Sequence, residues 1–227
     1  MATRRARSGR LTARLLRCGV VAGPLFVTTF LTAGAIRPDY NPLRHPVSGL
    51  MLGPGGWVQV ANFLVAGVLC TAAAAGLARA PHGLRTRLGP LLVGAVGVGF
   101  LGSGAFVTDP VSGYPPGTPD MLLEHSSTET ALHDLFALPV FLGLPAAALV
   151  YGWAFRRAGE RGWAAYSTAS GLAMIPAFVL ASAGFAQVPA VVAVAGLCQR
   201  LVVGIGLAWL TAMSVRALQA APVEVRT

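Results

Sequence analysis

Long runs of apolar residues, separated by shorter segments rich in polar residues, proline and glycine, recur along the whole sequence. The runs lie at about residues 18–36, 57–78, 88–107, 130–155, 162–186 and 188–215. Each is at least about as long as the ~17–25 residues that an α-helix needs to cross the ~30 Å hydrocarbon core of a bilayer. The pattern predicts an all-α polytopic transmembrane bundle of six helices. It forms one domain over residues 18–215, between a basic tail at 1–17 and a tail at 216–227.

The composition supports this class of protein. Hydrophobic residues make up 55% of the chain and charged residues only 11%, which is typical of a membrane protein and leaves no room for a separate soluble domain. All 17 basic residues are arginine. A genome rich in G and C would explain this exclusive use of arginine, so the basic balance gives no reason to expect a nucleic-acid partner. The lipid bilayer is the partner that the chain implies.

The arginines are placed asymmetrically along the predicted bundle. Fourteen of the 17 lie in the N-terminal tail, in the connections after the second and fourth helices, and in the C-terminal tail. Only Arg37 and Arg44 lie in the connection after the first helix. Arginine is enriched in cytoplasmic segments of membrane proteins. We therefore expect a plasma-membrane protein with both termini in the cytoplasm and with two long loops, residues 37–56 and 108–129, on the outer side.

Arg200 interrupts the last apolar run, about 11 residues or ~16 Å below the predicted outer end of that helix. A guanidinium near the middle of a bilayer costs at least ~2.5–3.5 kcal/mol, so a charged residue there marks a candidate functional site. The long side chain can reach outward toward Asp134 or Asp109. We expect one of these carboxylates to be its partner, and Arg200 to form the floor of a polar cavity that opens to the outer side.

Other polar residues are concentrated in the outer halves of the predicted helices and in the outer loops. The candidate ligand-binding residues are Arg44, His45, Gln59, Asn62, Asp109, His133, Asp134 and Arg200. An arginine at the floor of the cavity would suit an anionic headgroup or a carboxylate, so we expect an anionic or lipid-like ligand. Polar residues also fasten transmembrane helices together, and a purely structural or accessory role is therefore an alternative.

Two short motifs predict local structure in the outer loops. Pro46 suits the first position of a short helix, with His45 at its cap and Ser48 one turn later on the same side. The run that begins at Ser126 fits a capping box that starts the fourth helix. Asp134 then lies in the second turn of this helix, where we expect it to face the bundle interior because an uncompensated carboxylate is costly.

A metal-assisted hydrolase that acts on a lipid-like substrate is a further alternative. The candidate catalytic residues are His45, Ser48, Asp109, His133 and Asp134. Histidine and carboxylate side chains such as His45, His133 and Asp109, with His125 nearby, hold metal ions that activate water. However, the sequence contains no His-x-x-x-His pair. It therefore identifies no metal site or cofactor, and it leaves open whether the protein is an enzyme.

Five short strings carry a resemblance to a known family. They are Arg44-His45-Pro46-Val47-Ser48, Gly53 to Phe63, Thr108-Asp109-Pro110 with Gly113-Tyr114-Pro115-Pro116-Gly117, Leu132-His133-Asp134, and Gln199-Arg200-Leu201. In these strings the chain resembles the bacterial membrane family called domain of unknown function 998, and the similarity covers about residues 18–215. The resemblance implies an integral membrane protein of six helices and brings no established activity. Its motifs contain most of the candidate residues named above.

Overall fold

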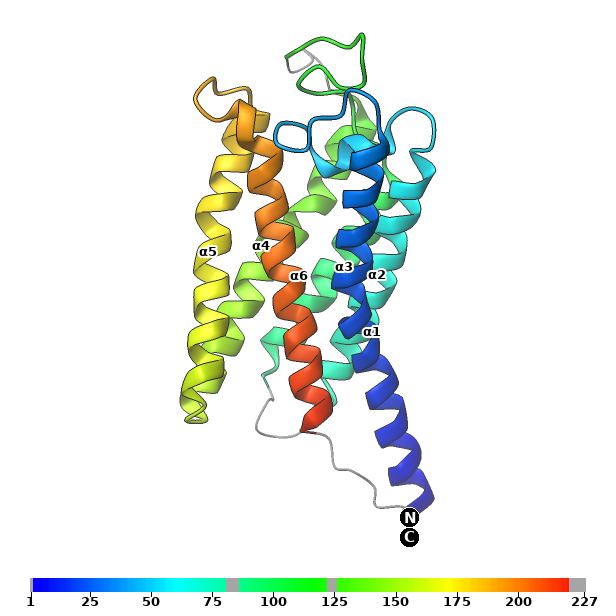
Figure 1. The fold of residues 1–227 in the computed structure, drawn as a ribbon. Helices are drawn as coiled ribbons and strands as arrows, with labels where there is room; N and C mark the ends of the chain where they lie inside the picture. Colours follow the sequence, from blue (N-terminus) through cyan, green and yellow to red (C-terminus); the bar gives the residue numbers. More distant parts are fainter. Residues whose placement is uncertain (1, 81–85, 122–125, 221–227) are drawn as a thin grey trace.

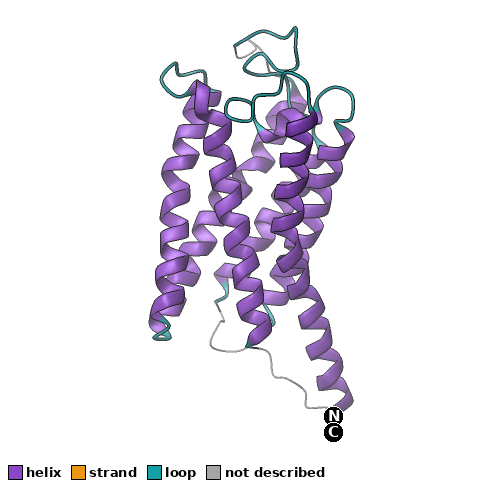
Figure 2. Ribbon diagram, in the orientation of Figure 1, coloured by secondary structure: helices purple, strands orange, loops and turns teal. Residues whose placement is uncertain are grey.

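The fold of the chain is a bundle of six long α-helices. The computed structural model describes residues 2–80, 86–121 and 126–220, with side chains from Ser8 onward. The helices are α1 (Ala2–Ile36), α2 (Trp57–Leu77), α3 (Leu88–Ala105), α4 (Thr128–Arg157), α5 (Arg161–Phe185) and α6 (Ala195–Gln219), with two short 3-10 helices, η1 (Val47–Met51) and η3 (Val192–Val194). The remaining described residues form loops and turns, and none of them forms a strand (Figure 2).

All six long helices are long and apolar enough to cross a membrane; in α1 this stretch begins at Ser8. The predicted all-helical bundle is therefore confirmed, and the chain is a multi-pass membrane protein. Helix α1 extends back to Ala2, into the segment expected as a tail. The orientation of the protein in the membrane stays a prediction.

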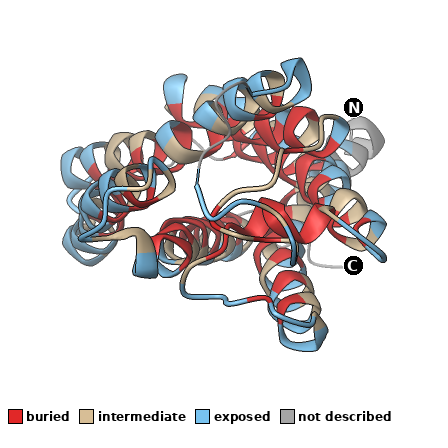
Figure 3. Ribbon diagram, turned by 90° about the horizontal axis from the view of Figure 1, so that it is seen from above, coloured by how far each residue is buried: buried red, intermediate tan, exposed pale blue. Residues whose placement is uncertain are grey.

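The helices form a closed ring. Each helix packs against the next one along the chain, and α6 returns to pack against α1. Helix α4 also contacts α6 across the ring, where a Cβ on Gly206 would lie 2.7 Å from Leu144. Buried residues face the inside of the ring and exposed residues face outward, as Figure 3 shows. This is the pattern of a bundle whose outer surface contacts lipid.

The two ends of the ring differ. Helix α1 begins and α6 ends at the same end, which we call the termini end (Figure 1). The opposite end, which we call the loop end, carries three connections: the first loop (residues 37–56), the second loop (residues 106–127) and the third loop (residues 186–194). The first two of these correspond to the long loops expected at residues 37–56 and 108–129, although α4 already begins at Thr128.

Glycines bring neighbouring helices close together. A Cβ on Gly97 of α3 would lie 2.3 Å from the Thr71 hydroxyl of α2, and one on Gly67 would lie 2.8 Å from the Gly97 carbonyl oxygen. On another face of α3, a Cβ on Gly102 would overlap the Phe136 ring of α4 at 2.0 Å. Small residues at such positions let transmembrane helices approach and pack tightly. These close contacts hold α3 between α2 and α4.

The last helix begins later than the sequence pattern indicates. Helix α5 ends at Phe185, Gln187 adopts a left-handed backbone conformation (φ 62°), and α6 starts only at Ala195. Pro189 explains part of this, because it disfavours helical geometry at the residue before it. Arg200 is consequently the sixth residue of α6, about 8 Å along the helix from its start. It lies near the loop end rather than deep in the bundle.

Candidate functional site

Arg200 fastens the first loop to α6. Its Nη1 donates hydrogen bonds to the carbonyl oxygens of His45 (3.0 Å) and Gly196 (2.9 Å), and its Nη2 donates to the hydroxyl of Tyr40. That hydroxyl donates in turn to the carbonyl oxygen of Pro46 (2.8 Å). The guanidinium also lies over the rings of Phe30 (5.7 Å) and Tyr40 (5.5 Å). Carbonyl dipoles and aromatic faces together stabilise the positive charge.

The expected pairing of Arg200 with Asp134 or Asp109 is wrong. Among the residues that the structure describes, the guanidinium has no carboxylate partner. The physical reason is the late start of α6, which brings Arg200 level with the first loop and its backbone carbonyl groups. Tyr40, which the sequence did not single out, supplies the polar side-chain contact instead.

The residues beside Arg200 bind the same loop. The side-chain oxygen of Gln199 accepts a hydrogen bond from the backbone N–H of Val47 (2.7 Å), and the backbone N–H of Leu197 donates to the carbonyl of Leu43 (2.9 Å). A Cβ on Gly196 would lie 2.4 Å from the His45 carbonyl oxygen. Residues 45–51 are buried, and they pack against the first turns of α6.

His45 connects the first loop to the second. Its Nδ1 accepts a hydrogen bond from the backbone N–H of Asn41 (2.9 Å), and its ring packs against that of Tyr114 at 5.1 Å. Burial lowers the pKa of His45 below its ordinary value of 6.5; a hydrogen bond with the Ser112 backbone opposes this, while the charge of Arg44 adds to it. His45 is therefore part of the folded loops, with Nδ1 bound to Asn41 and the ring packed against Tyr114.

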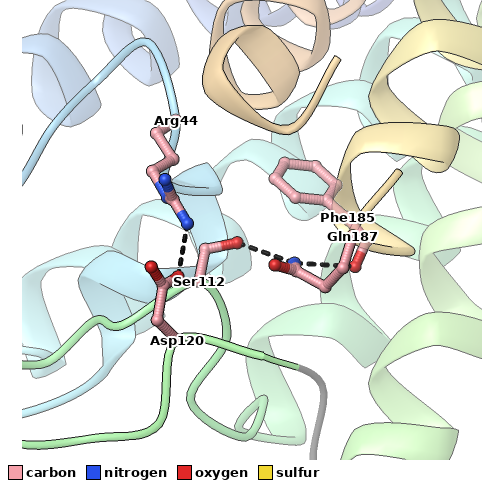
Figure 4. A network of polar contacts seen from close by, with 5 residues as sticks. All are labelled: Arg44, Ser112, Asp120, Phe185 and Gln187. Carbon is pink, nitrogen blue, oxygen red and sulfur yellow. Dashed lines mark hydrogen bonds and ion pairs between the residues drawn. The ribbon is translucent and has the colours of Figure 1, made fainter. Parts of the chain in front are cut away.

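The second loop is also held from both sides by polar side chains (Figure 4). Arg44 of the first loop forms an ion pair with Asp120. On the other side, the side-chain amide of Gln187 donates to the Ser112 hydroxyl (2.9 Å) and to the Phe185 carbonyl (3.2 Å). The Asp120 side chain is 63% exposed, so its ion pair contributes little stability by itself. The three loops nevertheless form one connected cap over the loop end.

A cavity of about 320 Å³ lies inside the ring next to this cap. Its walls are largely apolar and come from all six long helices and from the first two loops. They include the rings of Phe26, Phe63, Phe100, Phe141, Phe178 and Phe185. Its polar lining residues are Ser48, Ser103, Thr108, Asp109, Ser126, Thr130, His133, Asp134, Ser182 and Gln199. The cavity therefore combines an apolar body with a set of hydrogen-bonding groups from the first turns of α4 and the loops.

His133 is almost fully buried in the cavity wall, with 4% of its surface exposed. Its Nδ1 lies 2.9 Å from the carbonyl oxygen of Phe106, and the hydroxyl of Ser103 contacts the His133 carbonyl at 3.4 Å. In the neutral imidazole, a proton on Nδ1 donates to the Phe106 carbonyl and leaves Nε2 as an acceptor. Nε2 has no hydrogen-bond partner in the described part of the chain.

Asp109 organises the start of α4. Its carboxylate accepts a hydrogen bond from the backbone N–H of Ser127 (2.7 Å), and its own N–H donates to the Thr130 hydroxyl (2.6 Å). Ser127 caps the helix by accepting from the Thr130 N–H (3.1 Å), so the predicted capped start is present, one residue later than Ser126. Burial raises the pKa of Asp109, but the hydrogen bonds from Ser127 and Thr130 outweigh it and lower the pKa below its ordinary value.

Asp134 lies at the rim of the cavity. It lines the cavity as an exposed residue, so it faces the cavity from the rim and is not enclosed by the bundle. Two other lining residues, Leu138 of α4 (45% exposed) and Ser182 of α5, are also exposed residues. The cavity is thus not fully enclosed at its α4 and α5 walls, where exposed residues line it. Farther along these helices the rings of Phe141 and Phe178 stack at 5.4 Å and bridge the gap.

The remaining candidate residues lie outside the cavity lining. Arg44, His45 and Arg200 belong to the cap, so Arg200 does not form the cavity floor. Asn62 of α2 donates to the Phe26 carbonyl of α1 (3.1 Å) and to the side-chain oxygen of Gln59 (3.2 Å). Asn62 therefore fastens α2 to α1, and Gln59 orients it from within α2. Of the candidates, the cavity brings together Ser48, Asp109, His133 and Asp134.

No metal-binding cluster of three or more histidine, cysteine, aspartate or glutamate side chains occurs among the described residues. The proposed ligands are divided, because His133 and Asp109 line the cavity whereas His45 lies in the cap. His125 lies outside the described residues. The geometry therefore gives the hydrolase alternative no metal centre.

Comparison with known proteins identifies one family. A family model described as "Protein of unknown function (DUF998)" matches residues 20–216. No curated protein and no solved structure matches the chain.

Proposed function

The chain belongs to the DUF998 family of proteins of unknown function, and we propose that it binds a lipid-like amphiphile in the cavity between the cap and the bundle interior. The observation that carries this proposal is the cavity itself. Ligand sites have volumes of ~300–1,000 Å³, mostly apolar walls and a few converging polar groups. A volume of about 320 Å³ is at the lower end of that range, which favours a single acyl chain.

The position of the opening supports a ligand that comes from the bilayer. Leu138 of α4 and Ser182 of α5 line the cavity and are also exposed residues, so we place the opening between these two helices, toward the lipid. An amphiphile can place its chain between the two helices without crossing water. The polar groups of Asp109, His133 and Asp134 lie at the loop end of the same cavity, where the headgroup of such a molecule would lie.

The charges around the cavity favour a lipid-like ligand over an anionic one. The described lining residues include two carboxylates and no arginine. Arg200, the residue expected to bind an anion, already donates to two carbonyl groups and to Tyr40. Arg200 therefore has a structural role in holding the cap. The proposed binding site is the cavity, which is a different part of the molecule.

Filling the cavity tests the proposal. Ala181 of α5 is 3% exposed and lines the cavity, whereas Val179 on the same helix is 58% exposed and does not. Ala181→Phe should abolish co-purification of a bound amphiphile, measured by mass spectrometry of the protein released from detergent. Val179→Phe, which adds a similar ring on the lipid side, should leave it unchanged.

A second cavity-filling variant tests whether the loss of ligand in Ala181→Phe results from misfolding. Ala137→Phe fills the same cavity from α4, so both cavity variants should lose the ligand while keeping a cooperative thermal transition. Equal amounts of bound amphiphile in the wild type, in Ala181→Phe and in Ala137→Phe would refute the proposal.

A further inference from the structure

The basic side chains of the loop end bind other groups of the protein, although Nε of Arg200 has no described hydrogen-bond partner. Arg37 donates to the carbonyl oxygens of Leu52 (2.8 Å) and Leu50 (3.2 Å), Arg44 pairs with Asp120, and Arg200 binds carbonyl groups of the cap. None of these three arginines lines the cavity. The positive charge of the first loop is therefore neutralised or stabilised within the cap and does not reach the cavity.

The acidic side chains of the cavity are not balanced in the same way. The carboxylate of Asp109 accepts hydrogen bonds but has no cationic partner among the described residues, and Asp134 has neither a hydrogen bond nor an ion pair there. Both line the cavity at its loop end. A carboxylate beside an apolar cavity loses part of its hydration and is stabilised by a nearby positive charge.

Polar groups that line the same cavity also have no partner among the described residues. Ser48 is 8% exposed, and its hydroxyl has no hydrogen-bond partner in the described part of the chain. Gln199 is 9% exposed; its oxygen binds Val47, but its NH₂ group donates to no described residue. His133, at 4% exposed, presents Nε2 as an acceptor. Because these groups line one cavity and bind no described residue, their convergence there points to a polar ligand group.

From this combination we infer that the ligand is a single-chain amphiphile with a cationic, amine-type headgroup. The inference rests on the proposed function, since it assigns the headgroup to the ligand of the same cavity. An ammonium group has only donors, and it meets acceptors in the carboxylates of Asp109 and Asp134 and in Nε2 of His133. The apolar body of the cavity holds the chain. Ser48 and Gln199 bind a neighbouring hydroxyl or carbonyl group of the ligand.

The experiment compares three probes that share one chain and differ in the headgroup: dodecylamine, monododecanoylglycerol and dodecanoate. Each is titrated into purified, delipidated protein in a nonionic detergent at mildly alkaline pH. Binding is measured as thermal stabilisation. Dodecylamine should bind most tightly, the glycerol ester less tightly, and dodecanoate most weakly.

Asp134→Asn is the decisive variant, because Asp134 is at the rim and has no structural partner among the described residues. It should weaken dodecylamine binding about tenfold, the equivalent of ~1.4 kcal/mol, and leave binding of the glycerol ester within about twofold. Glu129→Gln is the matched control, since Glu129 is an exposed acid of the first turn of α4 that does not line the cavity. It should change neither affinity.

The outcomes separate this inference from the proposed function. Equal binding of all three probes, each lost in Ala181→Phe, would refute the cationic headgroup and leave the amphiphile site standing. Tightest binding of dodecanoate would also refute it. If Ala181→Phe binds every probe as the wild type does, the proposed function itself fails.

Discussion

Replacing Arg200 by methionine tests whether this residue holds the cap. The variant keeps an unbranched apolar stem but removes the guanidinium, and with it the hydrogen bonds to His45, Gly196 and Tyr40. Because the partners are backbone carbonyls and a tyrosine hydroxyl rather than carboxylates, no buried negative charge is left behind. The first loop should loosen while the six-helix ring stays assembled.

The expected loss follows from these contacts. Hydrogen bonds that involve a charged group contribute ~1.5–3 kcal/mol each, so three give a gross value of about 5–9 kcal/mol. Removing a partly buried charge recovers several kcal/mol of desolvation, and the freed loop carbonyls regain water. The free energy of unfolding should therefore fall by about 2–3 kcal/mol. For a chain of this size that corresponds to a fall in Tm of roughly 4–12 °C.

The assay is thermal unfolding in detergent, combined with limited trypsin digestion. Arg44 lies in the first loop, so cleavage there should be faster in Arg200→Met than in the wild type. A double-mutant cycle with Tyr40→Phe should give less than additive losses, with a coupling of about 0.5–3 kcal/mol. Asp134→Leu, which removes an exposed carboxylate without a described partner, should stay within ~0.5 kcal/mol of the wild type. A larger loss in Asp134→Leu than in Arg200→Met would refute this account of the cap.

Three further predictions follow from the loop end. The folded-state pKa of His45 is depressed. The stability that neutral His45 contributes is therefore complete above the unfolded pKa of 6.5 and is lost as pH falls through the lower folded pKa. The Tm of the wild type should decline on acidification below pH 6.5, and it should decline more than the Tm of His45→Asn. Gly196→Ala should lower stability by ~1–3 kcal/mol through overlap with the His45 carbonyl, whereas Gly204→Ala, with nothing within 4 Å of an added Cβ, should be neutral or stabilising in a thermal melt. In a cysteine-free background, Met121→Cys should react with a membrane-impermeant thiol reagent on intact cells and Ala158→Cys should not; the reverse labelling would overturn the predicted orientation.

The helices could be predicted from the sequence because the signal for a membrane span is local. Each run is long and apolar by itself, and the spans begin and end within a few residues of the structure except at two places. Residues 188–194 are apolar enough to belong to the last span, but Pro189 and the left-handed Gln187 interrupt the helix. The residues before Cys18 are rich in arginine, so the apolar run does not extend over them, although α1 already begins at Ala2. Polarity alone does not reveal where an apolar or a basic segment stops being helical.

The candidate site could be predicted only in part, for a different reason. Asp109, His133 and Ser48 were recognised by residue type, and the cavity brings them together. The partner of Arg200 could not be found in this way, since its acceptors are mainly backbone carbonyl groups and every residue carries one. The search for a carboxylate partner assumed that a charge requires an opposite charge. Carbonyl groups of a buried loop met the requirement instead.

The central claim is that an amphiphile occupies the cavity between the cap and the ring. A photoreactive dodecylamine that carries its reactive group at the end of the chain tests this most directly, with the labelled peptides identified by mass spectrometry. Labelling should concentrate on the α4 and α5 segments around Phe141 and Phe178, should be displaced by unlabelled dodecylamine, and should be lost in Ala181→Phe. Labelling spread evenly over the lipid-facing surfaces of all six helices, without displacement, would contradict the claim.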